Sequence, residues 1–434
     1  MQILDWQKLD AAGRKAALKR PLHQADTAVL EAVTAIVRQV SVRGDDAVRE
    51  YSARFDGSKR AELRVSQNEI DAAVSQIDPA LRAAMEQAIA NITAFHEAER
   101  PRSTRVETMP GVVCELQWRA IDTVGLYIPG GTAPLFSTLL MQAVPARIAG
   151  CCRVILCTPP REGKINPAIL AAAKLCGLSE IYAVGGAQAI AAMAYGTATI
   201  PKADKIFGPG NAYVTLAKQL VAQDTGGAAI DMPAGPSEVM VIAEASARPD
   251  WVASDLLAQA EHDADAQAIL VTTSAELAAQ VQKEVEKQMA SLPRRAIIEK
   301  SLSCGRIIIV PDMKTAIDVA NLYAPEHLII HNEDAVRWLP DIRNAGSVFL
   351  GAWTPESAGD YASGTNHVLP TYGAARAYNG ITVLSFMKSM TVQGITLAGL
   401  QSLGPVIEVM AKAEGLDAHA EAVLLRLKQN DPDI

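Results

Sequence analysis

The spacing of apolar and polar positions divides the chain at about residue 123. Between residues 24 and 98 apolar side chains recur with a helical period, which predicts amphipathic helices. The period is carried first by Val29, Leu30, Val33, Ile36, Val37 and Val40, and then by a segment from Ile70 towards Phe95. A short stretch at 112–118 alternates imperfectly and predicts a strand.

From residue 123 short apolar runs alternate with helical stretches, in two successive series. The strands of the first series are predicted at 123–128, 153–158, 180–184 and 205–207. Those of the second are predicted at 238–243, 267–272, 306–311, 327–331 and 347–350. Such alternation is typical of parallel sheets built from βαβ units. We therefore expect an α/β protein with two doubly wound, incompletely Rossmann-like parallel-sheet domains, a short N-terminal arm and a helical C-terminal tail.

These patterns also predict the domain boundaries. We expect an N-terminal helical arm over 1–23, a first α/β domain formed by 24–122 with 238–380, and a second over 123–237. A helical tail follows over 381–434. The stretch 351–380 is rich in Gly, Pro, Ser, Thr and Asn, which predicts a long loop, and loops of that length are usually functional.

Composition narrows the class of protein. The 434 residues carry a net charge of −8, so no basic surplus favours nucleic acid or an anionic membrane surface. The long uncharged stretches at 124–146 and 181–201 contain Gly or Pro breakers and fit buried strand–turn–helix units better than membrane spans. Early charges argue against a secretion signal. None of the six cysteines has C-x2-C spacing, which favours free thiols in the cytoplasm.

Three glycine-containing turns follow predicted strands and precede helical patterns, at 128–132, 184–188 and 207–211. They would lie on one edge of one sheet, where helix N-termini and close backbone approach suit a nucleotide. Tyr127, Gln188 and Asn211 could supply polar or stacking contacts there. The GxGxxG fingerprint is absent, so simple tight turns are the alternative interpretation.

Histidines with neighbouring carboxylate or amide side chains form four further candidates. Gln259 and His262 share one helix face, and Glu326-His327 opens a predicted strand. The other two pairs are Asp360 with His367 in the long loop, and Glu414 with His419 in the tail. Nitrogen and oxygen ligands without thiolate suit a catalytic divalent metal, zinc most readily. Surface or capping roles are the alternative for each pair, and no HExxH motif is present.

Longer motifs in the chain resemble the histidinol dehydrogenase family. The most specific is IDMPAGPSE at 230–238. Four others occur in the family's order: VGLYIPGG at 124–131, KIFGPGN at 205–211, PEHL at 325–328 and GTNH at 364–367. The resemblance covers essentially the whole chain.

The resemblance implies a cytoplasmic enzyme that oxidises L-histidinol through a held aldehyde to L-histidine, reducing two NAD molecules and requiring one zinc ion per subunit. By likeness, Glu326 and His327 are the catalytic acid–base pair, and Tyr127, Gln188 and Asn211 contact NAD. The implied zinc ligands are Gln259, His262, Asp360 and His419; these and His327 also face the substrate, together with Ser237, His367 and Glu414. The family further implies a homodimer in which the tail carries Glu414 and His419 into the partner's site.

Other functions stay open at this point. A dehydrogenase on the same scaffold would oxidise another polar primary alcohol. A metal-dependent hydrolase or lyase would use the glycine turns to hold a phosphate. A nucleotide-binding module without catalysis would leave the acid–base pair and the ligand set without a task.

Overall fold

The computed structural model describes residues 1–20, 27–130, 134–232 and 235–428. Parts of the predicted turn at 128–132 and of the motif at 230–238 therefore lie outside the described residues. The chain forms two units, one made of 1–99 and 121–386 and the other of 100–120 and 387–434. The fold class predicted from the sequence is confirmed, with two open parallel sheets in the first unit.

The first sheet of the first unit has six parallel strands, in the order β1-β11-β10-β9-β12-β13. Their bounds are β1 Gln2–Asp5, β9 Glu238–Ala243, β10 Gln267–Thr272, β11 Arg306–Ile309, β12 His327–His331 and β13 Ser347–Leu350. The N-terminal arm, expected to be helical, thus begins with an edge strand that pairs with β11. Helix α1 (Ala11–Ala17) follows it.

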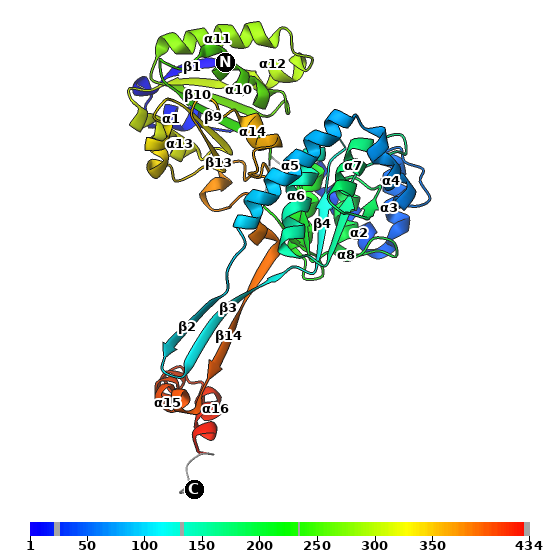
Figure 1. The fold of residues 1–434 in the computed structure, drawn as a ribbon, viewed down its shortest axis with the longest axis vertical. Helices are drawn as coiled ribbons and strands as arrows, with labels where there is room; N and C mark the ends of the chain where they lie inside the picture. Colours follow the sequence, from blue (N-terminus) through cyan, green and yellow to red (C-terminus); the bar gives the residue numbers. More distant parts are fainter. Residues whose placement is uncertain (21–26, 131–133, 233–234, 429–434) are drawn as a thin grey trace. The chain divides into compact units, whose positions relative to one another are not determined.

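Alternating side chains of β9 explain why helices cover both faces of this sheet. Val239 and Val241 belong to one apolar core with helices α10, α11 and α12, and Met240 and Ile242 to another with α1 and α13 (Figure 1). Successive strand residues point to opposite faces, so a strand apolar on both faces needs helices on both. The helix bounds are α10 Pro249–Ala260, α11 Ala275–Met289, α12 Arg295–Ser303 and α13 Met313–Tyr323.

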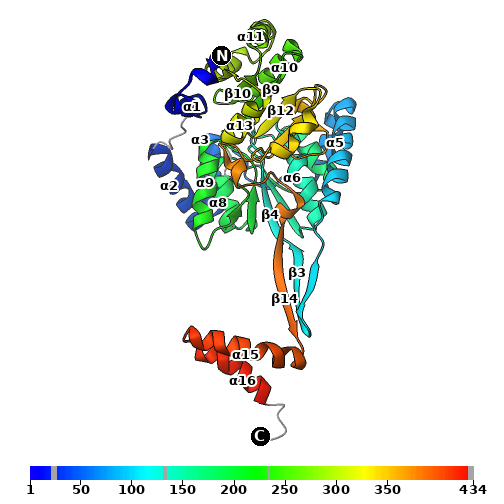
Figure 2. The same ribbon diagram turned by 90° about the vertical axis from the view of Figure 1, so that its left-hand side faces the viewer.

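The second sheet has five parallel strands, in the order β6-β5-β4-β7-β8. The strands are β4 Thr123–Tyr127, β5 Arg153–Cys157, β6 Glu180–Tyr182, β7 Lys205–Phe207 and β8 Ala229–Ile230. The connecting helices are α6 Phe136–Ala149, α7 Pro167–Leu175, α8 Gly186–Tyr195 and α9 Ala212–Gln223; Figure 2 shows α8 and α9 beside β4.

Four helices between residues 27 and 98 belong to this second sheet, not to the first domain as expected. They are α2 Thr27–Arg43, α3 Asp45–Phe55, α4 Gln67–Gln76 and α5 Pro79–Ala98. Helix α2 shares a core with α8 and α9, while α4 contacts α7 and α5 contacts α6. Their apolar stripes are real, but periodicity does not say which sheet a stripe covers. The segment from Ile70 to Phe95 is two helices, because Asp78 caps a new helix that has Pro79 in its first turn.

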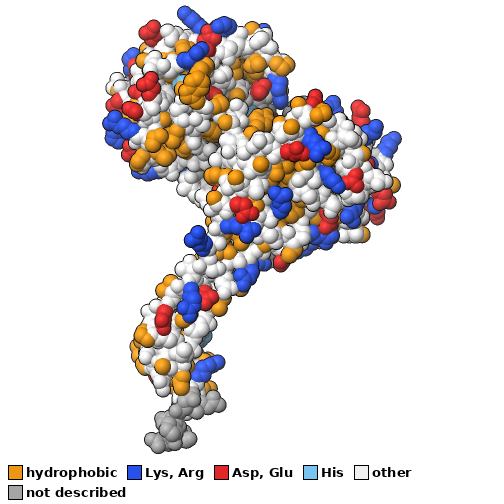
Figure 3. Space-filling model, in the orientation of Figure 1, with side chains coloured by type: hydrophobic (Ala, Val, Ile, Leu, Met, Phe, Trp, Pro, Cys, Tyr) orange, Lys and Arg blue, Asp and Glu red, His pale blue; other side chains and the backbone are white. Residues whose placement is uncertain are grey.

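The predicted loop at 351–380 contains a short helix, α14 (Glu356–Tyr361), and a 3-10 turn at Ala374–Arg376. A second 3-10 segment, Val383–Phe386, ends the first unit. On the face of this unit seen in Figure 3, basic and acidic side chains are interspersed.

The second unit is an antiparallel sheet of three strands followed by two helices. The strands are β2 Thr104–Met109, β3 Val112–Ala120 and β14 Met387–Ile395, and the helices are α15 Leu397–Ala413 and α16 Asp417–Lys428. The tail expected to be helical therefore starts with a strand. Within the described ranges, no helix combines the length and the apolar character that crossing a bilayer requires.

Candidate active site

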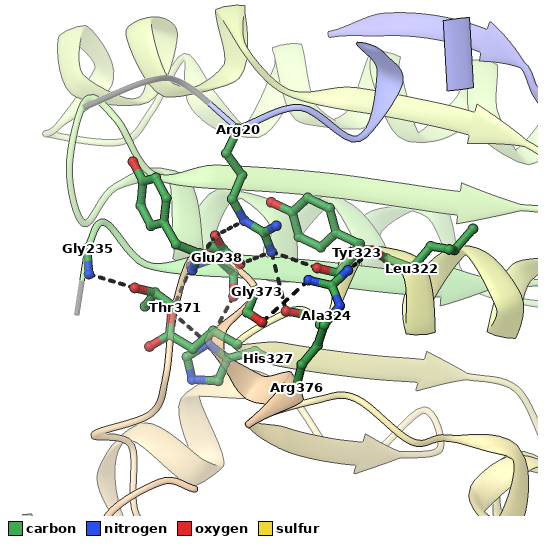
Figure 4. Close-up of polar contacts among 12 residues, drawn as sticks. Arg20, Gly235, Glu238, Leu322, Tyr323, Ala324, His327, Thr371, Gly373 and Arg376 are labelled. Atoms are coloured by element: carbon green, nitrogen blue, oxygen red, sulfur yellow. Dashed lines mark hydrogen bonds and ion pairs between the residues drawn. The ribbon is translucent and has the colours of Figure 1, made fainter. Parts of the chain in front are cut away.

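The predicted acid–base pair lies where β9 and β12 begin. Glu326 and His327 are both buried, and His327 Nδ1 is 3.6 Å from Glu326 Oε2. The backbone of Glu238 contacts both: its N–H donates to Glu326 Oε2 over 2.8 Å, and its carbonyl oxygen lies 3.1 Å from His327 Nδ1 (Figure 4). Since a carbonyl only accepts, Nδ1 carries the proton. In the neutral ring, Nε2 then has a free lone pair, and it has no hydrogen-bond partner among the described residues.

The electrostatics of this pair are strongly perturbed. Burial raises the pKa of Glu326 to about 8. Burial opposes charge on His327 as well, but the carboxylates of Glu356, Glu326 and Asp360 outweigh it and raise the pKa of the ring to about 10. Buried groups with strongly shifted pKa values are typical of sites that move protons.

A second group of side chains next to this pair could hold a metal. Ligand atoms of His262, Glu356 and Asp360 all lie within 4.8 Å of one another. Asp360 Oδ1 is also 3.6 Å from His327 Nε2. Gln259, in the last turn of α10, is fully buried, and neither its amide oxygen nor its amide nitrogen has a partner among the described residues. Nitrogen and oxygen donors with an orphaned amide fit a divalent metal such as zinc.

Glu356 is a site residue that the sequence analysis missed. It is the first residue of α14 and is 1% exposed, with Oε1 3.7 Å from His327 Nδ1. Burial raises its pKa. The long loop was expected to be functional, but this glutamate stands next to no histidine in the sequence, so no spacing signal marked it.

The remaining predicted substrate residues of the first unit lie around this cluster. His367 uses both ring nitrogens: Nδ1 donates to the carbonyl oxygen of Asp360 over 2.6 Å, and Nε2 lies 3.1 Å from Thr138 Oγ1. Thr138 belongs to α6, so His367 connects the loop to a helix of the second sheet. Ser237 is half-buried and directly precedes Glu238.

The predicted cofactor residues lie at the carboxyl ends of strands in the five-stranded sheet. The Tyr127 hydroxyl, at the end of β4, accepts a hydrogen bond from the Gly186 N–H over 3.1 Å. Gln188 is buried and donates to Asp56 Oδ2 over 3.3 Å. Asn211 is exposed and caps α9 by accepting from the N–H groups of residues 213 and 214.

Gly208 makes the turn after β7 possible. Its φ is +121°, and an added Cβ would lie 2.0 Å from the Tyr127 carbonyl oxygen. A buried ion pair holds the same turn: Lys218 Nζ donates to the Gly208 carbonyl over 2.8 Å and pairs with Asp231, which accepts from the Gly208 N–H over 2.9 Å. This turn lies at the carboxyl end of a parallel strand and next to the N-terminus of α9, the place where α/β sheets bind a dinucleotide.

The last two predicted residues belong to the second unit. Glu414 caps the C-terminus of α15, and His419 lies in the first turn of α16. Both side chains are exposed.

Two open parallel sheets, buried groups with perturbed pKa values at one strand edge and glycine turns at another define an α/β enzyme. The family model of histidinol dehydrogenase matches residues 18–427. The chain belongs to the histidinol dehydrogenase family and is an oxidoreductase.

Individual relatives agree along the whole length. A histidinol dehydrogenase of Xanthomonas euvesicatoria is 53% identical over 428 residues, which cover 98% of this chain and 99% of the relative. One of Vibrio cholerae is 52% identical over 429 residues, covering 99% of each. The crystal structure of histidinol dehydrogenase from Elizabethkingia anophelis matches with a TM-score of 0.95 at 48% identity, covering 99% of this chain and 98% of that one.

Proposed function

We propose that this protein oxidises L-histidinol to L-histidine in the last steps of histidine biosynthesis, with NAD as hydride acceptor and zinc as the bound metal. The observation that carries the proposal is the geometry of His327. Its Nδ1 faces the Glu238 carbonyl, and its Nε2 is unpartnered 3.6 Å from Asp360. In a family of dehydrogenases, that nitrogen suits the removal of an alcohol proton.

The reaction needs two hydride transfers. In the first, the carbinol carbon gives a hydride to NAD while His327 Nε2 takes the hydroxyl proton, which leaves bound L-histidinaldehyde. Water then adds to the aldehyde: Glu326 accepts a proton from that water, and His327 returns the proton it took to the carbonyl oxygen. The hydrate gives its second hydride to a second NAD, and its proton again goes to His327. A pKa of about 8 suits Glu326 to exchanging protons near neutral pH.

Gln259, His262 and Asp360, with His419 from a tail, would hold the zinc ion, and Glu356 is a further carboxylate within reach. Bound there, the metal would supply a Lewis acid that orients the substrate's nitrogen atoms and polarises its oxygen. Positive charge next to Asp360 would also offset the carboxylates that raise the pKa of His327. Ser237, His367 and Glu414 would bind the substrate. Tyr127, Gln188 and Asn211 would contact NAD.

We also propose a homodimer in which the second unit reaches the partner's site. Apolar side chains exposed on that unit support this, since large exposed apolar surfaces usually mark interfaces. They include Leu397, Val406, Val409, Met410 and Leu416. Free thiols at all six cysteines agree with a reducing compartment such as the cytoplasm.

One assay tests the reaction. Purified protein with zinc, NAD and L-histidinol is followed at the NADH absorbance, and products are separated chromatographically. The proposal requires two NADH and one L-histidine per L-histidinol. NADH formed only from another primary alcohol would support a dehydrogenase of different specificity. If no alcohol gives NADH, the result would favour a hydrolase, a lyase or a nucleotide-binding module without catalysis.

A further inference from the structure

Glu238 orients both members of the acid–base pair through its backbone alone. Its N–H donates to Glu326, and its carbonyl accepts from His327 Nδ1. The position of this backbone therefore sets the side-chain orientation of Glu326 and the tautomer of His327, which leaves Nε2 free to accept a proton. What holds Glu238 in place thus bears on the reaction, although its own side chain points elsewhere (Figure 4).

The Glu238 side chain is held by Arg20, a residue that no sequence motif marked. The carboxylate is fully buried and receives both Nε and Nη2 of the guanidinium, the latter over 2.8 Å. The Tyr372 N–H donates to the same carboxylate over 3.0 Å. Arg20 Nη2 also reaches the carbonyls of Tyr323, over 2.9 Å, and Ala324, over 3.3 Å. Its guanidinium carbon lies 3.8 Å from the centroid of the Tyr323 ring.

The two carbonyls contacted by Arg20 belong to the last residue and the C-cap of α13, and only Pro325 separates them from Glu326 and His327. Ala324 has a φ of +55°, a left-handed conformation that is uncommon for alanine and persists where the surroundings hold it. Arg20 itself follows α1, and Trp6 and Ala17 of that N-terminal segment pack in the same core as Tyr323. The guanidinium of Arg20 is therefore held by an N-terminal segment that is itself packed in the core.

We propose that Arg20 is a positioning residue for the acid–base pair. It fixes the start of β9 through the Glu238 carboxylate and the end of α13 through two carbonyls, and these two segments hold Glu326 and His327. This inference rests on the proposed roles of Glu326 and His327. Only arginine offers a planar fork that binds a carboxylate through two donors and still has donors for nearby carbonyls.

Arg20→Lys is the first test, because it keeps the charge and removes the fork. We expect kcat to fall at least tenfold, while the KM values for L-histidinol and NAD and the zinc content change less than twofold. The matched control is Arg153→Lys. Arg153 also pairs through two nitrogens with a carboxylate, that of Glu180, but at an exposed position on β5. The control should keep the wild-type kcat.

A second variant tests the same role in case Arg20→Lys does not fold. Arg20→Met with Glu238→Gln replaces the ion pair by a neutral pair and leaves no buried charge alone. We expect it to fold with wild-type zinc content and to keep the low kcat. A wild-type kcat in Arg20→Lys would overturn the positioning role. So would a low kcat in Arg20→Lys together with a wild-type kcat in the double variant, because the loss would then come from lower stability alone.

His327→Asn and the wild-type protein are assayed alongside. If the wild-type protein forms no NADH from L-histidinol, the proposed function is wrong and the positioning role with it. If the wild-type protein turns over, His327→Asn does not and Arg20→Lys keeps the wild-type kcat, only the role of Arg20 is wrong.

Discussion

The two parallel sheets of the first unit present their functional groups at opposite ends of their strands. In the six-stranded sheet, Glu238 and His327 are the first residues of β9 and β12. In the five-stranded sheet, Tyr127 is the last residue of β4, and Gly185 and Gly208 follow β6 and β7. Open α/β sheets ordinarily bind ligands at the carboxyl ends of strands. The glycine turns follow that rule, and the acid–base cluster departs from it. We call the strand ends with the glycine turns the glycine edge, and those with the acid–base cluster the acid–base edge.

The helices explain the difference in chemistry. Each connecting helix runs back along its sheet, so helix N-termini lie at the carboxyl ends of strands and helix C-termini at the amino ends. Gln259 and His262 lie at the C-terminus of α10, where partial negative charge favours a cation. Glycine turns precede the N-termini of α8 and α9, where partial positive charge favours an anion. One unit can thus hold a metal at one edge and a dinucleotide at the other.

The largest effect should come from the acid–base edge. Replacing His327 by Asn removes the proton acceptor, and we expect kcat to fall about 1,000-fold, within the usual range for general acid–base residues. Zinc content and NAD affinity should stay unchanged. His331→Asn, at the far end of the same strand and equally buried, should keep kcat. Turnover by His327→Asn near the wild-type level would remove the catalytic role.

Metal binding at the same edge is tested by Asp360→Ala. We expect zinc affinity, measured by competition with a chelator, to fall at least tenfold, because a charged ligand is lost. Activity should vanish on chelation of the wild-type protein and return with added zinc. Asp263→Ala, an exposed carboxylate close to His262 in the sequence, is the control. Equal zinc affinity in the two variants would exclude Asp360 as a ligand.

At the glycine edge, Gly208→Ala should act on the cofactor and not on the metal. The added Cβ meets the Tyr127 carbonyl oxygen at 2.0 Å, so the turn must shift. We expect the KM for NAD to rise about tenfold, which corresponds to about 1.4 kcal/mol, with zinc content unchanged. Gly150→Ala is the matched control, because it also places alanine at a positive φ, +86°, but its added Cβ meets nothing within 4 Å. An unchanged KM in Gly208→Ala would argue against a nucleotide at this turn.

The smallest effect concerns Asp56, a carboxylate at the glycine edge. Burial raises its pKa from 3.8 to about 6. The folded protein therefore holds this proton more tightly than the unfolded chain. Its contribution to stability is fully present below about pH 4 and is lost as the pH rises through about 6. Asp56→Asn should raise stability at pH 8 by on the order of 1 kcal/mol after solvent screening, and not at pH 4. Thermal unfolding at both pH values measures this, and an equal shift at both would contradict it.

Local pattern predicted most of the first unit. The strands predicted at 205–207, 238–243, 267–272, 327–331 and 347–350 agree with β7, β9, β10, β12 and β13 at both ends. Buried parallel strands are continuous apolar runs bounded by turn residues, so the sequence predicts where they begin and end. Strand β1 was missed because its Gln-Ile-Leu-Asp has no such run and forms only by pairing with β11.

For the site, the sequence by itself determined the family and the residue types at the strand ends, because long motifs and glycine turns are local features. Only the tertiary structure decided that helices α2 to α5 cover the second sheet, that Glu356 joins the metal cluster and that Arg20 holds Glu238 from 218 positions away. The physical reason is the same in each case. Period and composition define which face of an element is apolar or charged, but its partner is chosen by packing and charge pairing across the folded chain.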